Sequence, residues 1–238
     1  MPGYVFYDGP SMIDGSPIVG IAVTSESRNA KTGDMVQTYI IRADMPPIEA
    51  IRTGADDAIC GDCQHRGTSC YVDASKSVTA VFYAWMRGSY ELASPKRVAR
   101  MLRGRKVRIG AYGDPAAIPA MHWRDLVRYA DGHTGYSHQW RQSFAQGLRG
   151  IVMASADSPS DRDIARAMGW RTFRVRTADQ PLAAREIMCP ASDEAGKRRQ
   201  CATCMACDGA ARGAGQASVA IIVHGAKAKR FIPIAIAA

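Results

Sequence analysis

The chain has 238 residues, of which 47% are hydrophobic and 22% are charged. These values are typical of a globular protein and exclude a chain that is mainly disordered. The longest apolar runs contain seven or eight residues, whereas a membrane-spanning helix needs roughly 18. The first residues also lack a basic stretch followed by an apolar one, so we predict no signal peptide, no membrane partner and a cytoplasmic location.

The net charge is +9, from 31 Lys and Arg against 22 Asp and Glu. The segment Lys96–Arg108 holds seven of the basic residues and no acidic one. Two interpretations stay open for it. The segment is either the solvated face of a helix or a phosphate-binding patch, in which case nucleic acid is a partner.

The first part of the chain, up to about residue 105, is predicted to combine strands, a loop and helices. Two strands are expected at Ser16–Val23 and Met35–Arg42 because β-branched and aromatic residues are frequent there. A Cys- and Gly-rich loop follows at Ile59–Tyr71. We then predict a helix within Ser77–Leu92 and a short basic helix starting at Ser94-Pro95, where serine is a cap and proline fits the first turn.

From Lys106 onward, predicted strands alternate with predicted helices. The strands are expected at Val107–Ala111, Thr134–Trp140, Gly150–Ala154, Trp170–Arg176 and Ser218–His224, and the helices at Pro119–Tyr129 and Pro159–Met168. This alternation predicts an α/β fold with a mainly parallel sheet or a partial (β/α) barrel, and such sheets carry their sites at the carboxyl ends of the strands. We predict three regions in one compact unit: an N-terminal β-rich extension (1–58), an α/β core (59–188) and a C-terminal Cys-rich segment with a closing strand (189–238).

All seven cysteines fall into two groups. The first cysteine group is Cys60, Cys63 and Cys70, and the second cysteine group is Cys189, Cys201, Cys204 and Cys207. A reducing compartment disfavours disulfides, and clustered thiolates are ligands for zinc or iron–sulfur clusters. Both groups are therefore predicted to bind metal.

The spacing leaves the identity of the metal open. Cys201-x2-Cys204-x2-Cys207, with a remote Cys189-Pro190, has the ligand spacing of a ferredoxin half-site in permuted order, while zinc is the alternative. Three thiolates in the first cysteine group would leave one iron of a cluster open to a ligand. Alternatively, they would hold zinc with His65 or the distant His224 as the fourth ligand.

Polar residues near the ends of two predicted strands are candidates for catalysis. Strand alternation predicts that His138 shares a face with Tyr136 and Trp140, where it could orient a substrate or transfer a proton. Asp157 follows the next strand, although an Asp/Ser sequence before Pro159 is also explained by helix capping. The chain has neither a phosphate-binding Gly-x4-Gly-Lys-Ser/Thr loop nor a Gly-x-Ser-x-Gly elbow, which argues against nucleotide hydrolysis and serine hydrolysis.

A three-cysteine loop, a helix and a strand leading into Gly113-Asp114-Pro115 together resemble the layout of radical S-adenosylmethionine enzymes. The resemblance implies that the first cysteine group holds a [4Fe–4S] cluster with Tyr71 beside it. It also implies that Gly113, Asp114 and Pro115 approach the amino group of S-adenosylmethionine, and that the second cysteine group is an auxiliary iron–sulfur site. That family usually has Cys-x3-Cys-x2-Cys and six βα units. Here the spacing is Cys-x2-Cys-x6-Cys, and fewer than six units are predicted after the turn.

Two C-terminal motifs resemble those of Cys-rich proteins encoded by bacteriophages and prophages. They are the Cys-Pro-Ala-Ser-x-Glu-x-Gly stretch at Cys189–Gly196, which precedes Cys201–Cys207, and the Val-His-Gly at Val223–Gly225. This likeness implies metal binding in a host cytoplasm.

Two functional hypotheses follow. The first is an iron–sulfur enzyme that cleaves S-adenosylmethionine reductively and modifies a nucleic acid or a small molecule. The second is a non-catalytic protein that binds zinc through both cysteine groups and nucleic acid through its arginines.

Overall fold

A computed structural model describes residues 2–27, 29–210, 217–225 and 227–232 of the chain. The strands are β1 (Gly3–Pro10), β2 (Pro17–Val23), β3 (Val36–Arg42), β4 (Glu91–Leu92), β5 (Lys106–Tyr112), β6 (Gly132–Ser137), β7 (Met153–Ala156), β8 (Thr172–Arg176), β9 (Glu186–Met188) and β10 (Ser218–Ile222). The α-helices are α1 (Pro47–Thr53), α2 (Asp57–Cys60), α3 (Thr79–Met86), α4 (Pro95–Met101), α5 (Ala120–Leu126), α6 (Pro159–Ala167) and α7 (Cys201–Cys204). A π-type turn at Ala74–Val78 precedes α3, and short 3-10 segments lie at Pro115–Ala117, Ser143–Leu148 and Ala228–Arg230.

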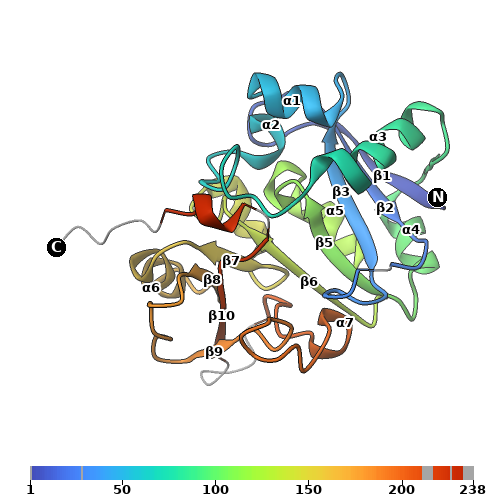
Figure 1. Cartoon of the computed structure of the whole chain (residues 1–238). Helices are drawn as coiled ribbons and strands as arrows, with labels where there is room; N and C mark the ends of the chain where they lie inside the picture. The colour runs from blue at the N-terminus through green and yellow to red at the C-terminus, as the bar shows by residue number, and fades with distance from the viewer. Residues whose placement is uncertain (1, 28, 211–216, 226, 233–238) are drawn as a thin grey trace.

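The strands form one ten-stranded sheet in the order β4-β1-β2-β3-β5-β6-β7-β8-β10-β9 (Figure 1). β2 pairs antiparallel with both β1 and β3, and every pairing from β3 to β9 is parallel. The predicted α/β class and mainly parallel sheet are confirmed. All three regions predicted from the sequence contribute strands to this one sheet, from the N-terminal extension to the closing strand.

Six parallel strands, β3, β5, β6, β7, β8 and β10, lie next to one another in the order in which the chain makes them. This sequential winding is the arrangement of a (β/α) barrel rather than of a doubly wound sheet. After the Gly113–Pro115 turn that follows β5, four of these strands remain, so the prediction of fewer than six units after the turn is confirmed.

The central strands are apolar because both of their faces are covered. In β2, all six residues from Ile18 to Val23 are buried, and an unbroken apolar run is typical of an inner strand. Gly20 lies in this run where a Cβ would come within 2.7 Å of Ile118 and 2.9 Å of Phe6, so a larger residue would displace the core.

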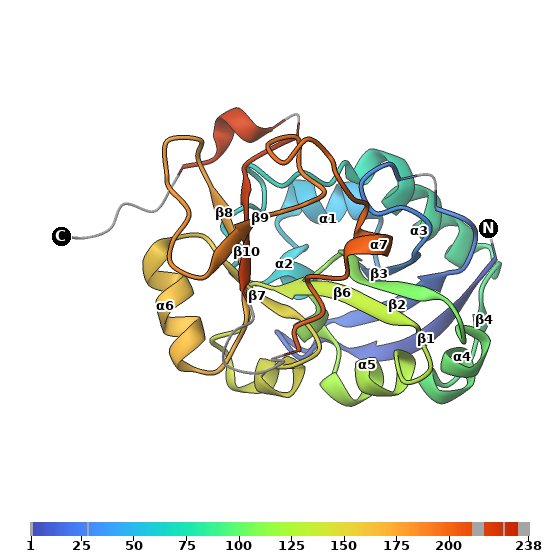
Figure 2. The same cartoon turned by 90° about the horizontal axis from the view of Figure 1, so that it is seen from below.

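Different elements cover the two faces of the sheet (Figure 2). On one face, α4 and α5 pack against β1, and the main core includes Phe6 in edge-to-face contact with Trp123 at 5.0 Å. On the other face lie α1, α2 and α3, together with the segment that carries α7. Ser94 caps α4 by accepting a hydrogen bond from the backbone N–H of Arg97, as the sequence predicts.

Four elements end two or more residues earlier than predicted, among them α5 at Leu126 and β10 at Ile222, and the other two have a clear cause. The helix expected within Ser77–Leu92 stops at Met86, because Gly88 turns the chain in the left-handed region at φ 70°. β6 ends at Ser137 rather than Trp140, because the backbone N–H of His138 donates to the Asp114 carboxylate and is not available for strand pairing. The predicted face is shared by Tyr136 and His138, which line one cavity, but not by Trp140, which is buried elsewhere.

The helices in the described part of the chain are all too short or too polar to cross a membrane.

Candidate functional site

A cavity of about 360 Å³ lies between the two cysteine groups. Its floor is one face of the parallel sheet, which contributes Arg108 of β5, Tyr136 of β6 and Phe173 of β8. Cys63 and Cys70 line one side of the cavity, and Cys201 of α7 lines the other. The structure therefore brings two cysteine groups that are more than 100 residues apart in the sequence to one space.

Hydrogen bonds fix the loop of the first cysteine group to the carboxyl ends of β5 and β6. The amide of Gln139 donates to the carbonyl of Cys60 at 3.1 Å and to the Asp62 carboxylate at 2.6 Å. The backbone N–H of Asp114 donates to the carbonyl of Ile59 at 2.6 Å. Gly61 has a φ of 57° and lies directly beneath Gln139, where a Cβ would come within 2.5 Å of the amide. Only glycine satisfies both conditions without displacing Gln139.

The thiols of the first cysteine group are near one another but do not meet at a single point. Burial raises the pKa of Cys60 well above its usual range, and the neighbouring Cys63 and Cys70 add to the shift. All seven cysteines are free thiols in the described chain. No three of their sulfur atoms lie within 4.8 Å of one another.

The second cysteine group gathers around β9 and α7. Cys189 follows β9, and Cys201 and Cys204 are the first and last residues of α7. The backbone carbonyl of Cys207 accepts a hydrogen bond from Gly135 N–H of β6 at 3.1 Å. Burial raises the pKa of Cys207 to about 12. Cys189, Cys201 and Cys207 pack in one apolar cluster. The fold therefore brings Cys189 close to two cysteines that are distant from it in the sequence.

The floor of the cavity holds a buried cation. The Arg108 guanidinium stacks over the Tyr136 ring at 4.2 Å and donates to the Tyr71 hydroxyl at 3.4 Å. Arg108 is only 4% exposed, and within the described residues no carboxylate lies within 4.0 Å of it. An arginine keeps its charge when buried, so this arrangement favours an anion in the cavity.

A second cation faces the same cavity. Lys31 Nζ donates to His224 Nε2 at 2.7 Å, while His224 Nδ1 lies 3.2 Å from the carbonyl of Ile222. These two contacts together imply a neutral His224 that carries its proton on Nδ1. The pKa of Lys31 is lowered, because the effect of burial is larger than the opposite effect of the cysteines of the second group. His224, which the sequence offers as a zinc ligand, stacks on Tyr71 at 5.8 Å instead.

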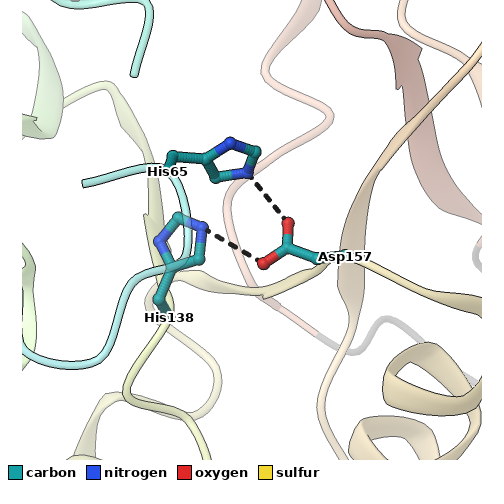
Figure 3. A group of neighbouring side chains, drawn as sticks. All are labelled: His65, His138 and Asp157. Atoms are coloured by element: carbon teal, nitrogen blue, oxygen red, sulfur yellow. Dashed lines mark hydrogen bonds and ion pairs between the residues drawn. The ribbon is translucent and has the colours of Figure 1, made fainter. Parts of the chain in front are cut away.

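His65, His138 and Asp157 converge at the rim of the cavity (Figure 3). His138 directly follows β6, and Asp157 directly follows the adjacent β7, so parallel pairing places them side by side. His65 comes from the loop of the first cysteine group. Its Nε2 lies 3.0 Å from Asp157 Oδ1, and His138 Nε2 lies 3.8 Å from Asp157 Oδ2.

The charges in this set support one another. Burial disfavours the charged form of His138, but Cys63 and Asp157 outweigh this effect and raise the pKa of His138 to about 10. Burial also disfavours the charged form of Asp157, but the hydrogen bond from His65 and the charge of His138 hold the pKa of Asp157 below its usual value. His65 Nδ1 lies 2.7 Å from the Ser69 hydroxyl, which orients the ring.

Asp114 has a role inside the protein. Its carboxylate accepts hydrogen bonds from the Ala116 N–H at 2.9 Å, the Ser137 hydroxyl at 2.7 Å and the His138 N–H at 2.6 Å. Asp114 is 6% exposed, and neither it nor Gly113 or Pro115 lines the cavity. The cofactor contacts predicted for these three residues stay predictions, and the observed contacts make Asp114 a positioning residue for His138.

The other sequence candidates are placed as follows. Tyr71 lines the cavity, and its predicted place beside a metal centre stays a prediction. Ser158 caps α6 by accepting a hydrogen bond from Asp161 N–H at 3.0 Å, so the capping interpretation applies to Ser158 while Asp157 joins the two histidines. Trp140 is buried and donates to the carbonyl of Ser155 at 2.9 Å.

The basic segment Lys96–Arg108 is divided by the fold. Arg108 faces the cavity, and Lys106 donates to the carbonyl of Ala202 at 2.6 Å. Of the exposed members, Lys96, Arg97 and Arg100 lie on α4, and Arg103 lies just after it. Because α4 packs on the opposite face of the sheet from α1–α3, the segment does not border the cavity as one patch (Figure 2).

Most residues of the site could be identified from the sequence, but the two basic side chains that face the cavity could not. His65 was singled out only as a zinc ligand, and neither Lys31 nor the inward direction of Arg108 was singled out. The available signal for Arg108 was its position in a strand between the apolar residues Val107 and Ile109, which reach the opposite face.

Comparisons with known proteins found no match: no family model, no curated protein and no solved structure is similar to this chain.

Proposed function

We propose that the chain is an iron–sulfur enzyme of the radical S-adenosylmethionine type. In this proposal, Cys60, Cys63 and Cys70 hold a [4Fe–4S] cluster, S-adenosylmethionine binds in the adjoining cavity, and the second cysteine group holds an auxiliary centre. Seven free thiols favour a reducing compartment, which is the cytoplasm of the host if the chain is phage-encoded.

One observation carries the proposal. The loop of the first cysteine group follows the first of six sequential parallel strands, and its Cys63 and Cys70 line a cavity on the sheet. In a (β/α) barrel, the loops at the carboxyl ends of the strands carry the active site. The three cysteines, the six strands and the cavity thus have the relative order that the sequence resemblance implies.

The thiols are not gathered at the spacing that a single zinc ion requires. Two thiolates on one tetrahedral zinc lie about 3.8 Å apart, because each Zn–S bond is about 2.3 Å long. Every set of three thiols in the described chain includes a pair more than 4.8 Å apart. In a [4Fe–4S] cluster each cysteine binds a different iron, so its thiolates lie farther apart than two thiolates on one zinc ion.

Cations near the second cysteine group support an anionic centre there. Four thiolates around a cluster carry a net negative charge, which is costly to bury without compensation. Arg108 and Lys31 both act to lower the pKa of Cys201, against the effect of burial. These two cations would compensate part of the charge of such a centre.

The cavity supports a small anionic ligand beside the first cysteine group. A volume of about 360 Å³ is within the range of small-molecule sites, roughly 300–1,000 Å³. Arg108 is placed to receive a carboxylate, such as that of the methionyl group. When bound and reduced, the cluster would supply one electron that breaks the sulfonium–C5′ bond, giving methionine and a 5′-deoxyadenosyl radical. The chain's own residues would bind the ligand and exclude water.

Metal analysis tests the first part of the proposal. After anaerobic reconstitution with iron and sulfide, we expect iron and acid-labile sulfide in equal amounts. Zinc alone, with no retained sulfide, would contradict the proposal and favour a non-catalytic zinc protein.

Replacing Arg108 with methionine tests the ligand. Loss of a hydrogen bond to a charged group costs about 1.5–3 kcal/mol, so we expect the Kd for S-adenosylmethionine to rise roughly 10- to 150-fold. Calorimetry on the reconstituted protein measures this, at an iron content equal to that of the wild type. Arg105→Met is the matched control, because Arg105 pairs with Asp34 at the surface. Equal affinity in wild type and Arg108→Met would remove Arg108 from the site.

We propose nucleic acid as a second substrate class. The exposed basic residues on α4 and just after it support this proposal. If Arg97, Arg100 and Arg103 contact phosphates, neutralising them lowers the affinity for DNA or RNA and flattens its dependence on salt, because fewer counterions are released. Filter binding at several salt concentrations measures the slope. A slope equal to that of the wild type would identify the segment as a solvated helix face.

A further inference from the structure

His65, His138 and Asp157 are the one set of three ligating side chains within 4.8 Å of one another in the described chain. We infer that they form a binding site for a single divalent first-row metal ion, such as iron(II), separate from both cysteine groups. This inference goes beyond the proposed function, since neither the cluster nor S-adenosylmethionine requires such an ion.

The distances between the ligand atoms fit one ion. Imidazole nitrogen and carboxylate oxygen bind divalent metals at about 2.0–2.2 Å, so two such ligands lie about 3.0 Å apart at a right angle and about 3.4 Å apart in a tetrahedron. His65 Nε2 and Asp157 Oδ1 are 3.0 Å apart. His138 Nε2 and Asp157 Oδ2 are 3.8 Å apart, so His138 would need to shift by a few tenths of an ångström.

The surroundings orient the ligands toward a shared point. His65 uses Nδ1 to contact Ser69 Oγ at 2.7 Å, which leaves Nε2 directed at Asp157 (Figure 3). A hydrogen bond at the non-ligating nitrogen is the usual support of a metal-bound histidine. His138 Nε2 is buried and has no hydrogen-bond partner in the described chain. Its backbone is fixed by Asp114, which accepts from the His138 N–H at 2.6 Å.

The donor set indicates the class of metal. Two histidines and one carboxylate leave several coordination positions open and are typical of iron(II) and related divalent ions. The side chains of His65, His138 and Asp157 are 11%, 23% and 9% exposed. Both histidines line the cavity, so the open positions face the space where a ligand would bind.

The test uses manganese(II), because thiols prefer softer metals and the cysteine groups then compete little. The full-length protein is treated with chelator, desalted and titrated with manganese(II), and the electron paramagnetic resonance signal of the free ion is followed. We expect one equivalent to bind. His65→Gln, His138→Gln and Asp157→Asn should each weaken binding by at least about tenfold, since removal of outer contacts alone costs that much.

Matched controls separate this site from general effects. His122→Gln and Asp125→Asn remove the same side-chain types from α5, away from the cavity, and should bind manganese(II) as the wild type does. Cys60→Ser should also bind normally, which distinguishes failure of this site from failure of the iron–sulfur proposal. Circular dichroism confirms that each variant is folded.

A measurement on the wild type alone keeps the inference testable if the variants unfold. Electron spin echo modulation of the bound manganese(II) should show coupling to two imidazole nitrogens. No binding by the wild type, no nitrogen coupling, or equal affinity in a folded Asp157→Asn variant would overturn the inference. The three side chains would then be a hydrogen-bonded set only.

Discussion

Replacing Cys63 with serine is expected to abolish the first iron–sulfur centre and all cleavage of S-adenosylmethionine. Cys63 lines the cavity beside His138, so under this proposal it would be a ligand on the side where the substrate binds. Serine has nearly the same shape, but its hydroxyl is a poor ligand for iron in comparison with a thiolate. Iron and sulfide analysis after anaerobic reconstitution should show that only the second centre remains.

Cys204→Ser is the matched control for this prediction. It should lower the iron content by removing the second centre, while the first centre remains. Retention of the full wild-type iron content in Cys63→Ser would show that Cys63 holds no cluster. Equal losses in both variants, with no difference in the spectrum of the remaining iron, would show that the two groups are not separate centres.

Replacing Glu186 with glutamine is expected to destabilise the fold by about 3–5 kcal/mol, the usual cost of removing one partner of a buried ion pair. Arg174 Nε and Nη2 donate to the two oxygens of Glu186 at 2.9 and 2.6 Å, and the side chains are 1% and 0% exposed. Without the carboxylate, Arg174 would be a buried charge next to β10. Urea denaturation with a two-state fit measures the change in the free energy of unfolding.

The same variant should change the dependence of stability on pH. Burial disfavours the charged form of Glu186, but the hydrogen bond and charge of Arg174 outweigh it and lower the pKa of Glu186. Stability from a carboxylate with a lowered pKa is fully present above the unfolded pKa and is lost as pH falls through the folded pKa. The difference between wild type and Glu186→Gln should therefore shrink on acidification.

Glu91→Gln provides the control, because Glu91 pairs with Arg97 while both side chains are about half exposed. We expect a change within about 1 kcal/mol for this surface pair. A loss in Glu186→Gln no larger than that of Glu91→Gln would contradict the role given to the buried pair.

The sequence was sufficient to predict the parallel sheet because most of its strands are apolar runs bounded by turns. Ile18–Val23 in β2 and Val219–Ile222 in β10 have this pattern, and both lie in the sheet. The short strands β4 and β9 were not predicted, since two or three residues carry too little pattern to distinguish a strand from a loop.

The end of β6 depends on a contact that local sequence does not contain. Asp114 is 24 residues away from His138 in the chain and ends the strand by accepting a hydrogen bond from the His138 backbone N–H. Periodicity alone extends the strand to Trp140, because the residues are polar and apolar in alternation. The prediction therefore placed His138 inside the strand, whereas His138 directly follows its end.

The convergence of the histidines was only half predictable. His138 and Asp157 follow consecutive strands, so a parallel sheet implies that they are neighbours. His65 reaches them from a loop whose path depends on Gln139 and Asp62. That placement is a property of the tertiary structure, and the sequence offers only the nearness of His65 to Cys63.

The central claim is that this chain cleaves S-adenosylmethionine at the first cysteine group. Its most direct test is to reconstitute the wild-type protein anaerobically, reduce it with a one-electron donor in the presence of S-adenosylmethionine, and quantify the nucleoside by chromatography and mass spectrometry. The account predicts 5′-deoxyadenosine and methionine in equal amounts, and none from Cys63→Ser. No 5′-deoxyadenosine from wild-type protein that carries its full iron and sulfide would contradict it.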